Sequence, residues 1–210
     1  MQRTKQSIKN ASFSVACQIL QQLIKIAVRI MFIKVIGQEY LGLNSVFTEI
    51  LTALQLVELG VGPAMAYSLY KPLAENNTEK VKTLMSLFKK AYRIIGIIIL
   101  LIGIAFTPFY GFFINGVPDI PHINLIYIIF VIDTSISYFY SYYRTLLISD
   151  QKKYIDMSIQ TGVIVVVSIA QIFLIHLTHN YMLYLFRTSF GYNTYKCFGI
   201  TGYKKRISIS

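Results

Sequence analysis

Polar and charged side chains recur on one helical face of an apolar segment near the start of this chain. At about 100° of rotation per residue, six of them within 12–36 share that face: Ser14, Gln18, Gln21, Gln22, Lys25 and Arg29. Guanidinium and ammonium groups pair well with phosphate oxygens. A charge at bilayer depth costs at least about 2.5–3.5 kcal/mol on insertion scales, so it normally faces a bundle interior or a water-filled cavity. This face therefore predicts a path for a polar or charged substrate.

Two later apolar segments carry polar faces of the same kind. The face in 41–70 lies within about 40° of one line and holds Asn44, Thr48, Gln55, Glu58 and Gly62. The face in 122–143 and its flank holds Asp133, Ser137, Tyr140 and Arg144. Because three helices each present a polar stripe, we expect the stripes to line one hydrophilic cavity.

The charged members of these stripes are the candidate functional residues. Lys25, Arg29 and Arg144 are the predicted substrate-binding cations. The predicted cavity-lining or ion-coupling residues are Gln18, Gln22, Glu58 and Asp133. Internal ion pairs that hold the bundle together, such as Arg29 with Glu58, are the alternative explanation, and the sequence leaves it open.

The sequence contains no recognisable catalytic or metal-binding motif. It has no HExxH, P-loop, Ser–His–Asp set or paired loop carboxylates. Cys17 and Cys197 form no CxxC, and His176 and His179 lack a nearby third ligand. We therefore expect no enzyme activity, no cofactor and no metal.

Composition points to a membrane protein. The 210 residues are 55% hydrophobic and 14% charged, yet the net charge is +11. Soluble domains carry roughly 25% charged residues, and a nucleic-acid binder would cluster its basic residues on a water-soluble fold. We therefore predict an all-α integral membrane protein that contacts membrane lipids and does not bind nucleic acid.

Segments long enough to cross a bilayer, which needs about 20 apolar residues, divide the chain. The predicted spans are 12–36, 41–70, 94–114, 122–143 and 157–177. They form a bundle over 1–185. The remaining 186–210 reads as a basic tail, non-native or disordered.

Basic residues distinguish the two ends of this bundle. Twelve flank the spans on one side: Arg3, Lys5, Lys9, Lys71, Lys80, Lys82, Lys89, Lys90, Arg93, Arg144, Lys152 and Lys153. The opposite links, 37–40, 116–121 and 178–181, contain none. The positive-inside rule therefore predicts a multi-pass protein of the cell membrane with a cytoplasmic N-terminus.

The third span raises two local questions. Thr78–Arg93 has an apolar face and a lysine-rich face, so it is either an amphipathic helix along the inner leaflet or an extension of the span that follows. Gly96 and Gly103, seven residues apart, predict close packing against a neighbouring helix.

Several motifs resemble one family. They are Lys9-Asn10, Arg29, GQEYLGLNSVFTEIL (37–51), ELGVGPAMAYSLYKPLAE (58–75), LMSLFKKAYRIIG (84–96) and TPF (107–109). These motifs, together with 5–185 as a whole, resemble the N-terminal half of Wzx-type oligosaccharide and polysaccharide flippases of Gram-positive bacteria. Such flippases belong to the multidrug/oligosaccharidyl-lipid/polysaccharide exporter superfamily.

The resemblance implies a fold, a substrate and a mechanism. Family members have two lobes around a central cationic cavity. They move a polyprenyl-diphosphate-linked oligosaccharide to the outer leaflet by alternating access, for cell-surface polysaccharide biosynthesis. Lys25 and Arg29 match the family's cavity cations, and Arg144 is a weaker match. Glu58 and Asp133 would be counter-charges or sites coupled to a proton or sodium ion, and both roles stay open. Other polysaccharide-assembly membrane proteins are the implied partners.

The sequence also departs from the family. A sixth apolar helix should begin near Tyr181, but 186–210 contains no run long enough to span and carries five basic residues. A frameshift or an early stop that replaced the sixth helix would explain both departures. We therefore expect a truncated, incomplete first lobe with little or no transport alone. The alternative is a membrane fragment or assembly partner without transport activity. A membrane enzyme is disfavoured, because the outer links are too short for an active site.

Overall fold

The computed structural model describes residues 2–58, 60–113, 120–150, 153–178 and 180–185, and this part of the chain contains helices and no strand. The α-helices are α1 (Gln2–Val35), α2 (Gln38–Leu54), α3 (Val61–Ala74), α4 (Thr78–Ala105), α5 (Ile123–Ser149) and α6 (Lys153–Thr178). Two 3₁₀ turns, η1 (Gln55–Glu58) and η2 (Tyr110–Phe113), follow α2 and α4. Residues 186–210, predicted to be a basic tail, lie outside the described residues.

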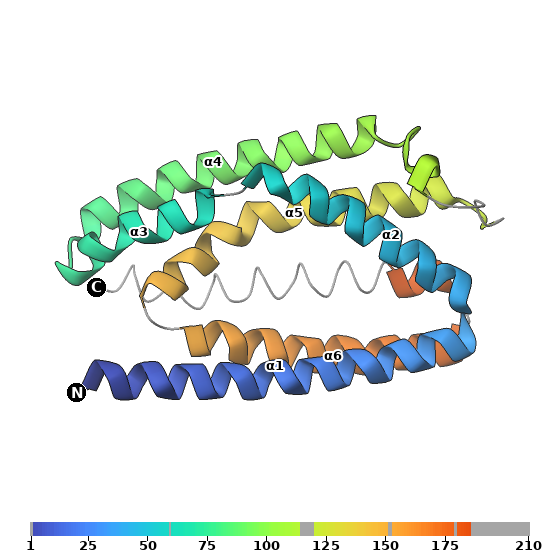
Figure 1. Ribbon diagram of the computed structural model, residues 1–210, viewed down its shortest axis with the longest axis horizontal. Helices are drawn as coiled ribbons and strands as arrows, with labels where there is room; N and C mark the ends of the chain where they lie inside the picture. The colour runs from blue at the N-terminus through green and yellow to red at the C-terminus, as the bar shows by residue number, and fades with distance from the viewer. Residues whose placement is uncertain (1, 59, 114–119, 151–152, 179, 186–210) are drawn as a thin grey trace.

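The helices run back and forth along the long axis of the molecule (Figure 1). α1, α4 and α6 run in one direction, while α5 and the consecutive pair α2 and α3 run in the other. Gly37 permits the reversal after α1, because its φ of 108° is a conformation that other residues rarely adopt. This alternation agrees with the order expected from the basic residues. Which end faces the cytoplasm remains a prediction.

Three helices are long and apolar enough to cross a membrane. They are Ser12–Val35 within α1, Ile123–Ser149, and Tyr154–Thr178 within α6. The faces of these helices that do not pack on other helices expose large apolar side chains, including Ile19, Leu23 and Ile26 on α1. Soluble monomers rarely expose large apolar patches, so these faces are suited to contact with lipid. The structure thus supports an all-helical membrane protein.

Two of the five expected spans have other boundaries than the sequence suggested. The prediction of one helix over 41–70 is wrong, since the helix breaks between Glu58 and Val61, where Gly60 has a φ of 92°. The helix expected over 94–114 ends at Ala105, shortly before Pro108, which lacks the N–H that an interior helical residue donates. Neither α2 nor α3 reaches 18 residues.

The question about Thr78–Arg93 is answered by the continuity of α4. Thr78–Ala105 is a single helix of 28 residues, so the lysine-rich part is an extension of the apolar part. Its start is fixed by Asn77, whose side chain accepts a hydrogen bond from the backbone N–H of Lys80 at 3.0 Å. The basic residues Lys89, Lys90 and Arg93 immediately precede the apolar half of α4.

Close packing of α4 on α5 confirms the prediction from Gly96 and Gly103. A Cβ at Gly103 would lie 2.5 Å from Val131 Cγ1, and one at Gly96 would lie 3.1 Å from the Ser135 carbonyl oxygen. Ser135 Oγ donates a 2.7 Å hydrogen bond to the Gly96 carbonyl oxygen. α3 also packs on both α4 and α5, and α2 contacts them less extensively.

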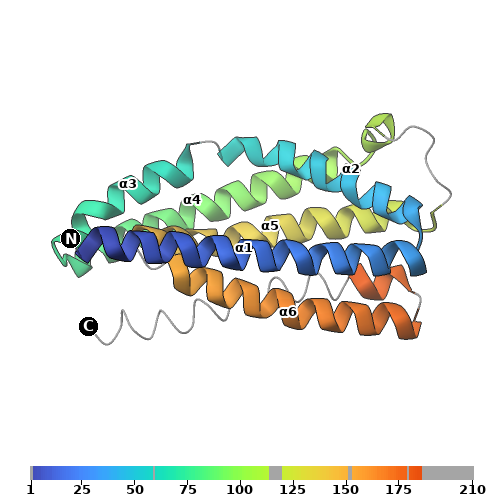
Figure 2. The same ribbon diagram turned by 60° about the horizontal axis from the view of Figure 1, so that its bottom comes forward.

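α1 and α6 form a second pair, side by side in both views (Figures 1 and 2). Their contact with the other helices is slight and falls largely on the chain neighbours α2 and α5. The core has two clusters. One is rich in aromatic residues and includes Phe32, Phe47 and Tyr127, and the other includes Leu69 and Tyr92.

Candidate functional site

The six residues of the polar face predicted on α1 do not share one environment, since two are buried and four are exposed. Ser14 and Gln21 are buried, and Gln21 Nε2 donates a 2.7 Å hydrogen bond to Thr161 Oγ1 on α6. The other four members are exposed: Gln18, Gln22, Lys25 and Arg29. Cys17 and Val28 are buried along with Ser14 and Gln21 at helical spacing, so this narrow seam faces α6 and the cations lie beside it.

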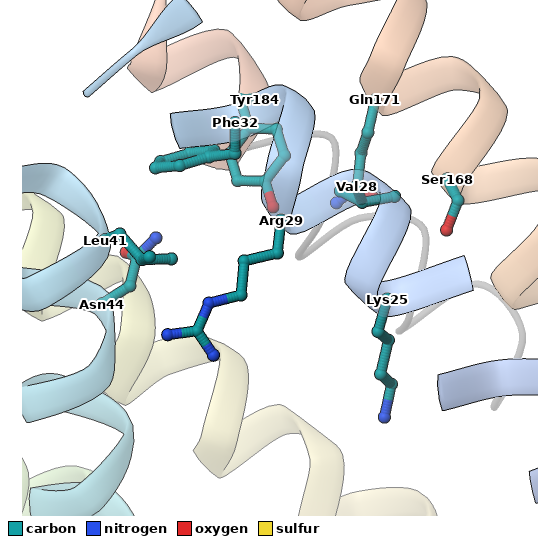
Figure 3. Close-up of a pocket in the computed structure, with 9 residues that line it drawn as sticks. All are labelled: Lys25, Val28, Arg29, Phe32, Leu41, Asn44, Ser168, Gln171 and Tyr184. Atoms are coloured by element: carbon teal, nitrogen blue, oxygen red, sulfur yellow. The ribbon is translucent and has the colours of Figure 1, made fainter. Parts of the chain in front are cut away.

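Two of the predicted cations line one pocket of about 190 Å³, here called the Arg29 pocket (Figure 3). Its lining residues come from α1, α2, α6 and the short helical segment 181–185: Lys25, Val28, Arg29, Phe32, Leu41, Asn44, Ser168, Gln171 and Tyr184. Lys25 and Arg29 extend from α1 to the same side (Figure 3). Gln18 and Gln22, predicted to line the same cavity, are not among these residues.

The Arg29 pocket is electropositive. Its lining contains Lys25 and Arg29 and no carboxylate, and among the described residues neither cation forms an ion pair. Ser168 and Gln171, both buried, bring polar atoms from α6. A pocket with two cations and no acidic side chain favours an anionic ligand, because phosphate and carboxylate oxygens accept charge-assisted hydrogen bonds.

Asn44 is held in place by a tyrosine that lies outside the predicted polar faces. The Tyr181 hydroxyl donates a hydrogen bond to Asn44 Oδ1, and the Tyr181 ring lies 4.6 Å from Tyr40 and 6.0 Å from Phe32. Burial raises the pKa of the Tyr181 hydroxyl well above its usual range, so it stays a neutral donor. The only sequence signal was a pair of tyrosines, at 181 and 184, just after the last apolar run.

Arg144 does not join the other two cations. It lines a second pocket, of about 500 Å³, here called the Glu58 pocket. The residues lining that pocket are Glu58, Gly62, Pro63, Ala66, Tyr92, Ser141, Arg144, Thr145 and Ile148. The expectation that all three cations line one cavity is therefore wrong for the described structure. Arg144 lies beside Asp156 at the start of α6, whereas Lys25 and Arg29 share a pocket with Ser168 and Gln171, about three to four turns further along that helix.

Arg144 has a carboxylate partner that sequence reasoning missed. Its Nη2 lies 3.1 Å from Asp156 Oδ2 on α6, and Nε donates to the same oxygen at 3.3 Å. The Asp156 side chain is 5% exposed, and that of Arg144 is 39% exposed. The signal was present in the sequence, since Asp156 opens the last apolar run, but its partner on another helix depends on the packing.

The two predicted acidic residues also differ. Glu58 Oε1 accepts a 2.6 Å hydrogen bond from the Tyr92 hydroxyl. Glu58 and Arg29 line different pockets, so the ion pair between them that the sequence left open is not formed here. Asp133 is partly buried on α5 and lines neither pocket.

No protein-family model, curated protein or solved structure matches this chain. Membership of the flippase family therefore stays a prediction from the sequence motifs.

Proposed function

We propose that this chain is a lobe of a flippase that exports polyprenyl-diphosphate-linked oligosaccharides across the cell membrane. The observation that carries the proposal is the Arg29 pocket, which pairs two cations on an apolar helix with no carboxylate in its lining. The motif resemblance supplies the substrate class. In this proposal Lys25 and Arg29 bind the diphosphate, and the multi-pass bundle has its N-terminus in the cytoplasm.

The size of the pocket limits which part of the substrate it holds. Sites that bury a drug-sized ligand measure roughly 300–1,000 Å³, whereas the Arg29 pocket measures about 190 Å³. It is therefore suited to the diphosphate group, with the sugars outside it. Asn44, held by Tyr181, brings an amide N–H₂ to the rim that can donate to a phosphate or sugar oxygen.

Cations at this position reduce the cost of moving the substrate. A charged group in the bilayer core loses its hydration, and fixed positive groups replace part of it. Arginine offers a planar fork of donors and lysine a point charge, so together they can hold two phosphates. Alternating access would need a second lobe opposite this surface, as in the family that the motifs resemble. Transport is therefore proposed for the assembled lobes and not for this chain alone.

A binding measurement on the isolated chain tests the cation role. The chain is reconstituted in nanodiscs, and affinity is measured for a polyprenyl-diphosphate-linked sugar and for the neutral polyprenol. Hydrogen bonds to charged groups are worth about 1.5–3 kcal/mol, so Arg29→Ala should weaken diphosphate binding by about 10-fold to 100-fold. Lys25→Ala should act in the same direction.

Lys34→Ala is the matched control, because Lys34 is exposed on the same helix and does not line the pocket. It should bind like the unaltered chain. Equal affinity for the diphosphate lipid and the neutral polyprenol, or equal losses in Arg29→Ala and Lys34→Ala, would contradict the proposal. Co-expression with a separate second half then tests export, and a lack of export would favour the non-transporting alternative.

A further inference from the structure

The exposed side of α4 changes character once along its length. Apart from Leu87, the exposed side chains of its first half are polar or charged, and they include Lys82, Lys89, Lys90 and Arg93. After Arg93 the exposed large side chains are apolar: Ile94, Ile97, Leu101, Ile102 and Ile104. A helix that passes from lipid headgroups into hydrocarbon shows such a change. The boundary on α4 therefore lies at Arg93.

α5 gives an independent measure of the same boundary. Gly96 of α4 packs on Phe139 and Ser135 of α5, and Arg93 interacts electrostatically with Tyr142. Arg93 thus lies at the level of Tyr142. From the start of α5 at Ile123 to this level the helix measures about 30 Å, at about 1.5 Å per residue. A bilayer core has the same thickness, so the two helices agree on the boundary.

Exposed tyrosines on α3 lie on the headgroup side of this boundary. α3 runs opposite to α4 and packs on it (Figure 1), and a Cβ at Gly62 would lie 3.6 Å from the Tyr92 hydroxyl. Tyr67 and Tyr70 follow Gly62 along α3, toward the first half of α4, and are 79% and 50% exposed. Tyrosine is enriched at the membrane–water interface. The end of α3 and the first half of α4 are therefore placed among lipid headgroups.

The cations in this region form a row with no intramolecular counter-charge. At about 100° per residue, Lys82, Lys89 and Arg93 lie within about 40° of one line, here called the basic row. The first half of α4 holds five basic residues and one acidic residue, Glu79. Within the described residues none of the five forms an ion pair. Lys89 and Arg93, four residues apart, repel each other, so an external anion would stabilise the row.

We infer that the basic row of α4 binds the headgroup of an anionic phospholipid. The phosphodiester lies against Lys89 and Arg93, because guanidinium and ammonium groups form charge-assisted hydrogen bonds with phosphate oxygens. The acyl chains lie along the apolar residues that follow, such as Ile97 and Leu101. A general attraction between a basic protein and an anionic membrane would depend on net charge alone, whereas this row predicts a lipid at one place. The inference does not depend on the proposed export function.

Native mass spectrometry of the purified full chain in detergent tests the inference. Bound lipid is counted as phosphatidylglycerol or phosphatidylcholine with the same acyl chains is added. Phosphatidylglycerol should bind at a several-fold lower concentration, because the choline group of the other lipid carries its own positive charge. A basic residue near an anionic headgroup is worth about five-fold in affinity. The double variant Lys89→Gln, Arg93→Gln should therefore weaken phosphatidylglycerol binding more than about ten-fold.

The matched control is the double variant Lys71→Gln, Lys80→Gln, which removes the same amount of charge. Both lysines are exposed, Lys71 is paired with Glu75 at 3.9 Å, and Lys80 lies on the side of α4 opposite the basic row. This variant should keep the preference for phosphatidylglycerol. Equal losses in the two double variants would overturn the inference, as would equal binding of the two lipids by the unaltered chain.

Ser86→Glu provides a second test that removes no native cation. Ser86 is exposed beside the basic row, and a glutamate four residues before Lys90 favours the helix, so this variant should fold. Its carboxylate should weaken phosphatidylglycerol binding several-fold, and unchanged binding would contradict the inference.

Glycerol phosphate distinguishes a lipid from a soluble phosphate, because it carries the anion without acyl chains. It should displace bound phosphatidylglycerol poorly. Displacement at a concentration equal to that of the lipid would assign the basic row to a soluble ligand and overturn the inference. None of these measurements involves the diphosphate lipid, so failure here and failure of the export proposal are separate results.

Discussion

The α4–α5 pair and the α1–α6 pair are held together by different contacts. Between α4 and α5, Gly96 and Gly103 allow backbones to approach closely. Between α1 and α6, a buried polar seam includes the Gln21–Thr161 hydrogen bond. The close-packed pair leaves no room for a side chain at Gly96 and Gly103, although both helices contribute residues to the Glu58 pocket, whereas the polar pair carries the exposed cations of the Arg29 pocket along its side. Close glycine packing therefore distinguishes the first pair, and a polar seam beside two exposed cations distinguishes the second.

The largest expected effect comes from the contact that joins the two pairs. Arg144→Ala removes the partner of the buried Asp156 carboxylate. Breaking a buried ion pair costs about 3–5 kcal/mol, and the partial exposure of Arg144 moves the expected loss of unfolding free energy toward about 3 kcal/mol. Unfolding in mixed micelles measures it.

The control for this prediction is the exposed pair Lys71–Glu75, at 3.9 Å on α3 and its C-terminal cap. Lys71→Ala should cost less than about 0.5 kcal/mol, since exposed pairs contribute little. If both variants lose the same small amount, Arg144 does not join the helix pairs and is available for substrate, as the sequence suggested.

An intermediate effect is expected within the close-packed pair. In Gly103→Ala the new methyl group would approach Val131 Cγ1 to 2.5 Å. Valine is stiff at χ1, so the helices must separate, and overpacking of this kind costs about 1–3 kcal/mol. The same unfolding measurement applies.

Gly162→Ala is the counterpart on α6, because a Cβ there meets nothing within 4 Å. Helix propensity should make this variant more stable, by up to about 1 kcal/mol. Losses of similar size at Gly103 and Gly162 would show that the two helix pairs do not differ in packing.

The smallest effect is expected in the polar seam. A double-mutant cycle with Gln21→Leu and Thr161→Val isolates the hydrogen bond between α1 and α6. Such bonds in membrane proteins average about 0.6 kcal/mol. A coupling energy above about 2 kcal/mol would mean that the polar seam holds its helices as strongly as glycine packing does, and the contrast between the pairs would be lost.

Local patterns predicted the helices well and their interruptions less well. The apolar runs in 122–143 and 157–177 correspond to α5 and α6, and the two glycines of α4 indicated its close contact with α5. The break at Gly60 was missed because 41–70 reads as a continuous apolar helix. The sequence did contain a signal for the break, since Gly60, Gly62 and Pro63 stand within four residues and proline is favoured in the first turn of a helix, but the hydropathy of 41–70 outweighed it.

The candidate site was predicted in part. Helical periodicity correctly placed Lys25 and Arg29 together, because residues four apart share a face. It also grouped Gln21 with them, although this side chain turns toward Thr161. The angular difference between these positions is small, and only the location of the neighbouring helix decides which part of a polar stripe is buried.

By itself the sequence determined that the chain is helical, that several of its helices are apolar enough for a membrane, and that cationic and carboxylate side chains occur within the apolar runs. These properties are local, since they follow from hydropathy and spacing along one segment. The tertiary structure alone decided which charges meet. Arg144 forms an ion pair with Asp156, Glu58 accepts a hydrogen bond from Tyr92, and no carboxylate lines the pocket that holds Lys25 and Arg29. The partner of a charge is set by the packing of different helices, which no single segment encodes.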